Sequence, residues 1–468
     1  MSSKQFKDPV YGYVEVAEPI VERIVDTPSF QRQRHVRQLS ATYLVYPGAN
    51  HTRFEHALGV FALAKRVFRS LRSQRRFARG ASADHLDAVE NTLKCAALLH
   101  DIGHPPLSHL GEHHLDTAAL RDRLDDVGLV DAFEEAGIEV GAPDGPFRRA
   151  SPHELLSCVV VMRKYADALR GLGVDPHEVC GYVLGYSLTY EREGDRYFGV
   201  AAEVLHSPID VDRLDYIIRD SRMTGAEVLS VDAERMIDAY TAVPDAGLAL
   251  RDKALSTIGN YLEGRVALYM WVTQHHKAVY ANVLLREMLD EFVTLADERP
   301  ITADEVLDGY VDDYYAMERI RKAAREHPDS TLAALHDRFR SRRFPESCWK
   351  HGVGYSESVE ATDDMAAFSG WLLDNADALE ADLAAALDLP VHEVWIERSY
   401  VPEYEPGELL DIPIAHRDST RSVAETGLYG DRAFEGAIPF VFVPDGHRWA
   451  AIAHLDAEFA RSEAAEAV

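Results

Sequence analysis

The sequence predicts a mainly α-helical protein: a helix bundle preceded by a short hairpin and followed by a small α+β lobe. Three observations lead to this fold class. Apolar residues recur at three- and four-residue spacing from Ala17 to about Tyr240, a pattern typical of amphipathic helices. Period-two alternation precedes this region, and strand-like apolar runs follow only after Pro390. We therefore expect strands at the two ends of the chain and helices between them.

Local signals define the individual elements. Asp8 to Val16 alternates around a turn signal and predicts a hairpin strand. The segment Ala136 to Ser151, rich in Gly, Pro and Asp, predicts a loop, and Ser151-Pro152 followed by Glu154 is typical of a helix start. Helices are predicted at Ala57 to Leu71, Leu86 to Leu99, Leu155 to Leu172, Val179 to Tyr186, Ser256 to Ala296 and Ala303 to Phe339, and strands at Val391 to Glu397 and Ile438 to Pro444.

The length of the chain implies more than one structural unit. With 468 residues it exceeds the usual size of a single hydrophobic core. We predict a helical core that carries the chemistry over residues 1–290, a helical extension over 291–380 and a small α+β lobe over 381–468. Hydrophobic residues make up 47% of the chain, which is enough to build such cores.

The formal net charge of -29 is spread along the whole chain, and lysine is scarce beside arginine. Two explanations stay open. One is a surface of the halophilic type, adapted to a high-salt cytoplasm in which charges are screened over about 3 Å at 1 M salt; the other is an ordinary acidic protein. In either case we do not expect nucleic acid as a partner, because binding to phosphate backbones requires basic stripes.

The sequence also indicates the cellular setting. It has no run of about eighteen apolar residues and no charged-then-apolar leader, so we expect a soluble cytoplasmic protein without a membrane partner. Its cysteines are widely spaced, lack a paired motif and are expected to be buried thiols without a chemical role: Cys95, Cys158, Cys180 and Cys348.

The run His100-Asp101 is the most informative feature of the chain. It follows the apolar stretch Leu93 to Leu99, so an imidazole and a carboxylate end a helix that is otherwise built to be buried, and a buried charge needs a partner. His56 and Asp212 supply further ligands from distant segments. Two nitrogens and two carboxylates suit a divalent metal ion such as Mn, Fe, Zn, Ni or Mg. No short zinc-type spacing joins them, so the fold has to assemble the site.

In these residues the chain resembles the HD-domain phosphohydrolase superfamily, whose metal centre is a His, a His-Asp doublet and a later Asp on packed helices. The resemblance extends from about residue 6 to about residue 290. It is nearest to the deoxynucleoside triphosphate triphosphohydrolases, the group of the SAM-and-HD-domain enzyme, and no SAM domain is expected before the core. The resemblance implies an HD-type bundle for residues 1–290, with His56, His100, Asp101 and Asp212 as the metal ligands.

Further histidines follow the doublet. Pro105-Pro106 ends the helix, so His104 and His109 are expected in a loop or at the next helix start, turned back over the metal. Histidine titrates near neutrality and can protonate a leaving oxygen. The resemblance implies that His109 and His153, supported by Glu112, handle the leaving group and the α-phosphate. Which histidine delivers the proton stays open.

Two segments are expected to contact the substrate. Arg53 precedes His56 by three residues and shares its helix face, and the resemblance gives Arg53 a phosphate contact. In the second segment, Asp212, Tyr216 and Arg219 share one face at i, i+4 and i+7 and are expected to form a wall for a nucleotide, with Asp220 beside them. The resemblance implies a phosphate contact for Arg213, which replaces the lysine of the nearest relatives, a nucleoside contact for Tyr216 and a sugar-hydroxyl contact for Asp220.

Looser matches complete the expected site. Gln38 and Leu39 fit a Gln-Leu pair that lines the sugar pocket of the family, although an ordinary helix position is the alternative. His276 and Lys277, with His275 before them and Tyr280 after them, resemble the distal phosphate and base wall. An exposed basic patch is the alternative for this segment.

The resemblance implies metal-dependent hydrolysis of deoxynucleoside triphosphates to deoxynucleoside and inorganic triphosphate, with dGTP among the substrates. It also implies a homo-oligomer controlled by a nucleotide activator. Another phosphohydrolase activity of the superfamily, that of a nucleotidase or a phosphodiesterase, is the first alternative. A nucleotide-sensing or nucleic-acid-binding scaffold with a vestigial centre is the second, although all the metal-ligand types are present. Phosphate electrostatics indicates the class of enzyme, and attack at the α-phosphorus rests on the resemblance alone.

Overall fold

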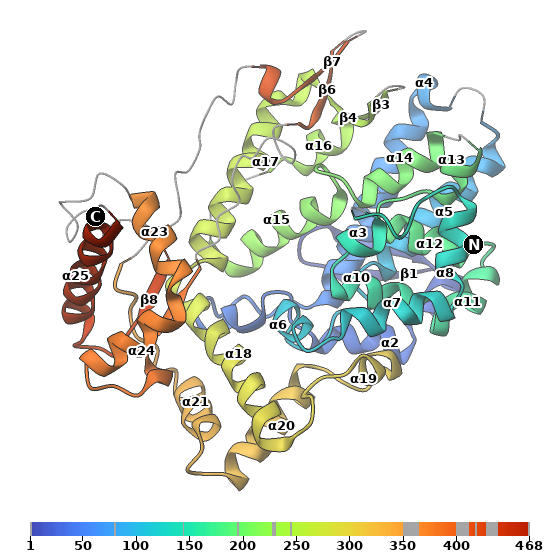
Figure 1. Cartoon of the computed structure of the whole chain (residues 1–468). Coiled ribbons are helices and arrows are strands. Elements are labelled where there is room, and N and C mark those ends of the chain that lie inside the picture. Colours follow the sequence, from blue (N-terminus) through green and yellow to red (C-terminus); the bar gives the residue numbers. More distant parts are fainter. Residues whose placement is uncertain are drawn as a thin grey trace.

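A computed structural model gives the arrangement of the chain (Figure 1). It describes residues 2–78, 81–143, 145–193, 196–226, 231–243, 246–349, 365–398, 411–416, 419–426 and 439–466. Helices dominate, as the sequence predicts, and the strands form small sheets. Among the described residues, no helix combines the length and the apolar character that crossing a membrane requires.

The helices and strands have the following bounds. The principal helices are α2 (Pro28–Gln31), α3 (Arg53–Ser73), α5 (Ala83–Leu99), α6 (His109–Glu112), α7 (Thr117–Asp126), α8 (Leu129–Glu135), α9 (Pro146–Arg149), α10 (Pro152–Val160), α11 (Ala166–Arg170), α12 (Pro176–Val183), α13 (Leu188–Glu193), α14 (Arg196–Leu205), α15 (Val211–Thr224), α16 (Ala233–Ala239), α17 (Leu255–Leu268), α18 (His276–Ala296), α19 (Ala303–Asp308), α20 (Asp313–Glu326), α21 (Thr331–Arg340), α23 (Met365–Asp374), α24 (Ala376–Ala386) and α25 (Arg448–Glu466). The short helices α1 (Glu18–Ile20) and α4 (Arg75–Ala78) join them. The strands are β1 (Ser3–Asp8), β2 (Gly12–Ala17), β3 (Tyr240–Val243), β4 (Gly247–Arg251), β5 (Trp395–Glu397), β6 (Pro413–His416), β7 (Ser419–Ser422) and β8 (Phe440–Phe442).

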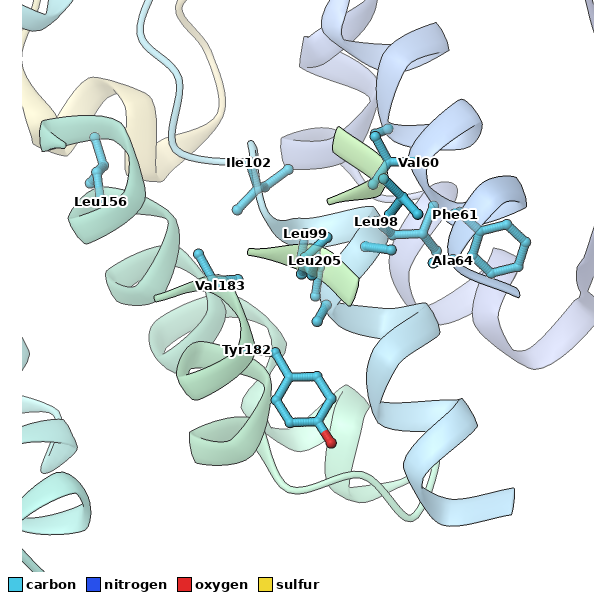
Figure 2. Close-up of a cluster of buried hydrophobic side chains, with 14 of the residues drawn as sticks. Val60, Phe61, Ala64, Leu98, Leu99, Ile102, Leu156, Tyr182, Val183 and Leu205 are labelled. Atoms are coloured by element: carbon cyan, nitrogen blue, oxygen red, sulfur yellow. The ribbon is translucent and has the colours of Figure 1, made fainter. Parts of the chain in front are cut away.

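Helices α3 and α5 form the centre of the bundle. Val60, Phe61 and Ala64 of α3 are buried in the same cluster as Leu98 and Leu99 at the end of α5 (Figure 2). Full burial of a leucine side chain contributes about 1.5–3 kcal/mol, so these contacts fix the end of α5 firmly against α3. The residues that directly follow Leu99 are therefore held at a defined place in the interior.

The sheets depart in part from the expected organisation. Strands β1 and β2 pair antiparallel and form the predicted N-terminal hairpin. Strands β5 and β8 also pair antiparallel, and they lie within the two predicted C-terminal strands, except that Ile438 is outside the described residues. Strands β6 and β7 join β3 and β4 instead, in the order β3-β4-β6-β7 with a parallel β4–β6 pair. Residues 413–416 and 419–422 therefore pair with strands next to the helical core, and the boundary at residue 381 stays a prediction.

A second hydrophobic cluster lies toward the C-terminal end. It joins Trp349, Phe368 and Leu372 with residues of α24, β8 and α25, which group together on the left of Figure 1. At its edge, the backbone N–H of Ile396 donates to Oε1 of Glu380 (2.7 Å) and so links α24 to β5. Burial raises the pKa of the Glu380 carboxyl to about 7.

Replacing Glu380 with glutamine is expected to stabilise the protein above pH 7. Folding raises the pKa of this carboxyl from its ordinary value near 4.5, so the protonated group favours the folded state most fully below pH 4.5. This contribution to stability is lost as the pH rises through about 7. Glutamine keeps the acceptor for Ile396 without the charge. After allowance for the partial exposure of Glu380, the gain at pH 8.5 is about 1–2 kcal/mol and vanishes near pH 4.5. Urea unfolding at both pH values measures it, with exposed Asp374→Asn as the control; equal effects of Glu380→Gln at the two pH values would contradict the assignment.

Candidate metal centre and catalytic cluster

The first two site residues lie in the first turn of α3. Thr52 and Glu55 form a capping box at this helix start, so the backbone geometry is well defined there. Arg53 and His56 follow the cap and are both buried, at 4% and 0% exposure. The predicted shared face of these two residues is confirmed, because both side chains meet Asp101: Arg53 Nη1 lies 2.5 Å and His56 Nε2 lies 3.6 Å from Asp101 Oδ2.

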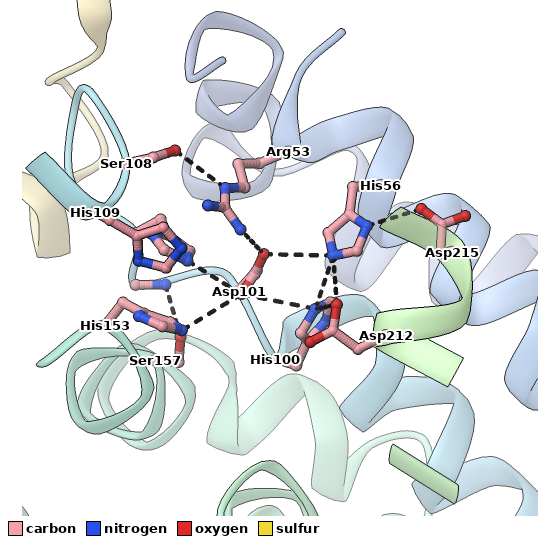
Figure 3. Close-up of polar contacts among 12 residues, drawn as sticks. Arg53, His56, His100, Asp101, Ser108, His109, His153, Ser157, Asp212 and Asp215 are labelled. Atoms are coloured by element: carbon pink, nitrogen blue, oxygen red, sulfur yellow. Dashed lines mark hydrogen bonds and ion pairs between the residues drawn. The ribbon is translucent and has the colours of Figure 1, made fainter. Parts of the chain in front are cut away.

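The four predicted ligands converge (Figure 3). His56 Nε2 lies 2.9 Å from Asp212 Oδ1 and 3.3 Å from His100 Nε2. His100 Nε2 is 3.6 Å from Asp101 Oδ1 and 3.9 Å from Asp212 Oδ1. Two ligands bound at about 2.1 Å from one ion are separated by about 3 to 4 Å, depending on the coordination geometry. The donor atoms therefore have the spacing and the chemistry that a divalent ion requires, and HD-type metal binding fits the residues present.

Hydrogen bonds at the opposite ring nitrogens aim both imidazoles at the ion position. The Nδ1–H of His56 donates to Asp215 Oδ2 (2.8 Å), and that of His100 donates to the carbonyl of Ala97 (3.0 Å). An acceptor at Nδ1 places the proton there and leaves the lone pair of Nε2 for a metal. Burial lowers the pKa of His56, but hydrogen bonds to Asp212 and Asp215 outweigh it and raise this pKa to about 10. Without an ion, His56 therefore holds a proton that a metal has to displace.

Helix ends contribute to the electrostatics of the centre. The ligands His56 and Asp212 lie in the first turns of α3 and α15, whereas His100 and Asp101 directly follow the last turn of α5. Two helix N-termini favour an anion beside the site, and the C-terminus of α5 favours a cation. Burial would raise the pKa of Asp101, but Arg53, His100 and His104 hold it well below its usual range. Asp101 is thus a carboxylate at neutral pH.

A second cluster lies next to the metal ligands. Three imidazoles surround Oε1 of Glu112: His109 Nδ1 at 2.6 Å, His153 Nδ1 at 3.1 Å and His104 Nδ1 at 3.7 Å. The rings of His104 and His153 stack with their centroids 3.8 Å apart. His104 Nε2 is 3.3 Å from Asp101 Oδ1, so the cluster adjoins the metal centre directly. The structure brings together all of the residues that were predicted to be catalytic.

The loop after the doublet allows this close approach. A Cβ at Gly103 would lie 2.2 Å from the backbone nitrogen of Ser157, so only glycine lets the loop pack against α10, which carries His153. Leu107 and Ser108 have φ values of 64° and 53°, and this left-handed turn directs the chain back into α6 at His109. Helix α5 ends at Leu99, six residues before Pro105, so the prolines do not end it as predicted. The turn that returns the histidines contains non-glycine residues with positive φ.

The three histidines differ in charge and exposure. Burial, with Arg53 and His153 nearby, lowers the pKa of His104 well below its usual value, so His104 is neutral. Burial also lowers the pKa of His153, but Glu112 outweighs this effect and raises it. The side chain of His109 is 70% exposed, whereas those of His104 and His153 are 1% and 14% exposed. His109 therefore presents its outer nitrogen to solvent while Glu112 holds its inner one.

Residues of α15 correct the predicted nucleotide wall. Arg219 does not face outward with Asp212, because it is fully buried and bonded to Asp215 and Asp8. Asp220 is also buried, and its Oδ1 lies 2.7 Å from His51 Nε2, so a contact with a sugar hydroxyl would compete with this pair.

Two other residues of α15 retain part of their predicted placement. Tyr216 remains partly exposed one turn beyond Asp212, as predicted. Arg213 is paired with Asp210 and donates from Nη1 to the carbonyl of Ser207 (2.5 Å), so its guanidinium is bound to residues just before its own helix, and the phosphate contact stays a prediction.

The looser matches have mixed outcomes. Gln38 and Leu39 are partly buried, and Oε1 of Gln38 is a buried acceptor without a hydrogen-bond partner among the described residues, which suits a ligand contact. His276 is buried against His275, and Lys277 is half-buried. Tyr280 does not reach a site: it is fully buried.

The environment of Tyr280 explains this correction. Its ring packs on Phe344, Trp395 and Phe442, and its hydroxyl accepts a hydrogen bond from Arg338 (3.1 Å). Tyr280 therefore helps to join α18 to the C-terminal strands, and the prediction that it forms a base wall is wrong for this structure.

Sequence analysis missed two residues that shape the centre. Asp215 contacts His56, and Gly59 gives Asp215 room, since a Cβ at position 59 would lie 2.0 Å from Asp215 Oδ1. The spacing of Asp215 and Arg219, four residues apart on a helix with Leu214 and Ile217 buried beside them, is a signal that could have revealed a buried ion pair.

Comparison with known proteins agrees with this geometry. Residues 53–139 match the family model of the HD domain. Uncharacterized protein YwfO of Bacillus subtilis (strain 168) is 27% identical over 355 residues, which are 73% of this chain and 70% of that protein. Deoxynucleoside triphosphate triphosphohydrolase SAMHD1 of Gallus gallus is 29% identical over 305 residues, which are 61% of this chain; the chain spans 44% of that relative. The crystal structure of a phosphohydrolase from Bacteroides thetaiotaomicron VPI-5482 superposes with a TM-score of 0.63 at 20% identity, covering 94% of this chain and 98% of that one.

The fold and the site define a helical protein with a candidate His/Asp metal centre beside a histidine cluster. By these matches residues 53–139 form an HD domain, and the chain is similar to proteins that include a named deoxynucleoside triphosphate triphosphohydrolase.

Proposed function

We propose that the protein hydrolyses deoxynucleoside triphosphates, in a metal-dependent reaction, to deoxynucleosides and inorganic triphosphate. The observation that carries the proposal is that the candidate metal ligands and the histidine cluster meet at Asp101. His56 Nε2 lies 3.6 Å from Oδ2 of this carboxylate, whereas His100 Nε2 and His104 Nε2 lie 3.6 and 3.3 Å from Oδ1. The similarity to SAMHD1 from Gallus gallus, which is named as a deoxynucleoside triphosphate triphosphohydrolase, supports this choice of substrate.

Each side chain of the site has a role in this reaction. His56, His100 and Asp101, with Asp212 beside them, would hold a divalent ion, which would polarise a phosphoryl group and activate a water molecule. Arg53 is next to Asp101 and provides positive charge for the oxygens of the reacting phosphate. Burial of the Arg53 guanidinium keeps its charge effective, because electrostatic interactions are stronger where water is excluded.

His109 is the residue we assign to protonation of the leaving 5′-oxygen. Its Nδ1–H donates to Glu112 Oε1 (2.6 Å), which fixes the ring, and its exposed side chain can reach a bound substrate. His104 is neutral and buried, so it suits positioning rather than proton transfer. His153 shares Glu112 with His109 and is placed to donate to a phosphate oxygen.

Replacing Arg53 with alanine is expected to raise KM for the triphosphate by about 10- to 100-fold, because a hydrogen bond between charged groups contributes about 1.5–3 kcal/mol. Steady-state kinetics with saturating metal measures the change. Arg69→Ala on the same helix is the control, since Arg69 is 61% exposed and pairs with Glu90 at 3.5 Å. A loss confined to kcat would mean that Arg53 stabilises only the transition state. Unchanged kinetics would mean that Arg53 does not contact the substrate.

Product analysis tests the proposed function. The protein is incubated with dGTP and Mn²⁺, and phosphorus NMR follows the products. Tripolyphosphate and deoxyguanosine are the expected products, and they disappear when a chelator is added. Release of monophosphate or pyrophosphate would favour another phosphohydrolase activity, and the absence of any turnover with a panel of deoxynucleotides would contradict the proposal. GTP serves as the matched substrate, since Gln38 and Leu39 are proposed to reject ribose.

A further inference from the structure

A buried chain of charged residues leads from the metal ligand His56 to the N-terminal hairpin. Its first member is Asp215, which accepts the Nδ1–H of His56 at 2.8 Å. Asp215 is 0% exposed, and an isolated buried carboxylate is costly. The next member, Arg219, compensates this charge.

Arg219 holds Asp215 by two hydrogen bonds. Its Nε donates to Oδ2 (2.8 Å) and its Nη2 donates to Oδ1 (3.1 Å), so the guanidinium grips both oxygens of the carboxylate. Arg219 is itself fully buried. Because the two hydrogen bonds form one bidentate pair between residues one turn apart on α15, the carboxylate of Asp215 has little freedom to rotate away from His56.

Asp8 completes the chain from outside the helix bundle. Arg219 Nη1 donates to Asp8 Oδ2 at 2.8 Å, and Asp8 is 3% exposed. The other oxygen of Asp8 accepts the backbone N–H groups of Val10 and Tyr11, each at 2.8 Å, and so forms the turn between β1 and β2. One carboxylate therefore shapes the hairpin turn and also orients Arg219.

The packing of α3 against α15 makes room for this chain. A Cβ at Gly59 would lie 2.0 Å from Asp215 Oδ1 and 2.3 Å from Arg219 Nη2. The two carboxylates and one guanidinium leave one net negative charge beyond Nδ1 of His56. A negative charge behind a ligating imidazole makes its outer nitrogen a stronger donor to a cation.

We propose that Asp215, Arg219 and Asp8 are positioning residues for the metal ligand His56, so that the N-terminal hairpin is part of the metal centre. The inference rests on the proposed metal-dependent function. It predicts that a change at the hairpin turn, which touches no ligand, alters the affinity and the coordination of the ion.

Asp8→Asn provides the sharpest test. The asparagine Oδ1 still accepts from Val10 and Tyr11, so the turn is kept, whereas its NH₂ group replaces the acceptor for Arg219 with a donor. Asp215→Asn removes the charge next to His56 without a change in volume. Asp26→Asn is the matched control, because Asp26 pairs with Lys4 of the same hairpin at an exposed position, 3.0 Å away.

Binding of Co²⁺ to the full chain is measured by competition with a chelator and by its visible absorption spectrum, with the Tm of each metal-free variant recorded. We expect Asp215→Asn to weaken binding by about 10- to 100-fold and Asp8→Asn by about 10-fold, both with an altered spectrum, while Asp26→Asn matches the wild type. If Asp8→Asn folds and binds Co²⁺ with wild-type affinity and spectrum, the positioning role of Asp8 and Arg219 is wrong and the proposed function stands. If the wild type binds no Co²⁺, the proposed metal-dependent function itself fails. Loss of folding confined to Asp215→Asn leaves Asp8→Asn to decide.

Discussion

Replacing Asp101 with alanine is expected to abolish turnover and metal retention while most of the helix content remains. Asp101 directs Oδ2 toward His56 and Oδ1 toward both His100 and His104, so its loss removes a contact of the candidate metal ligands and of the histidine cluster at once. Metal stabilisation of a phosphoryl transition state is worth several kcal/mol, and we expect kcat to fall by about 1,000-fold or more. Metal analysis after dialysis, product assays and far-ultraviolet circular dichroism measure the three effects.

The structure also indicates how to separate lost chemistry from lost folding. Asp101→Ala leaves the guanidinium of Arg53 buried without its carboxylate partner, which is destabilising. Asp101→Asn keeps the volume and an acceptor for Arg53 but removes the charge that an ion requires. Asp87→Ala on α5 is the control, because its side chain is 59% exposed. Normal turnover in Asp101→Asn would mark Asp101 as structural. The same conclusion would follow if both variants unfold but retain bound metal for as long as they stay folded.

Replacing His109 with alanine is expected to lower kcat by about 100- to 10,000-fold, the usual range for loss of a general acid. Metal affinity is expected to stay near the wild-type value, because His109 contacts Glu112 and lies outside the set of metal ligands. Glu112→Gln is expected to share the defect in kcat, since it removes the charge that orients His109. Single-turnover kinetics and a metal titration measure the two properties.

The control for His109 is His327→Ala, a change of an exposed histidine at the end of α20. A substrate whose leaving group needs no proton, such as a p-nitrophenyl phosphodiester, adds a chemical test. If His109 protonates the leaving oxygen, its removal costs much less with this substrate. An equal loss with both substrates would assign proton transfer elsewhere, and His153 is the next candidate because Glu112 raises its pKa.

The sequence was sufficient to locate the principal site residues because each carries a local signal. The apolar run before His100 coincides with the last turns of α5, and Ser151 with Glu154 forms the predicted capping box that places His153 in the first turn of α10. The convergence of His56 and Asp212 on this pair came from resemblance, since no spacing in the chain brings α3 and α15 together. Their proximity in the structure, 2.9 Å between His56 Nε2 and Asp212 Oδ1, is a product of helix packing.

The errors on α15 and α18 have a common physical origin. Periodicity places Asp212, Tyr216 and Arg219 on one face, but the long side chain of Arg219 reaches back one turn to Asp215 and into the interior. Tyr280 carries a polar group at a position where a ligand contact was plausible, yet its ring fills the core and only its hydroxyl finds a partner. Side-chain direction in a packed helix depends on neighbours that are distant in the sequence.

Strands β6 and β7 show the same limit at the level of topology. The sequence predicts strands at Val391 to Glu397 and Ile438 to Pro444, and it indicates neither β6 and β7 nor their partners. Backbone pairing of Leu250 with Ile414 joins this segment to the helical core across a long stretch of chain. A parallel pair of this kind depends on the overall fold, because no hairpin turn specifies it.

Anomalous diffraction from crystals of the native protein grown with Mn²⁺ tests the central claim most directly. A single peak is expected within about 2.0–2.3 Å of His56 Nε2, His100 Nε2 and one carboxylate oxygen each of Asp101 and Asp212. A map with no peak among these four side chains, in crystals whose protein turns over dGTP with Mn²⁺, would contradict it.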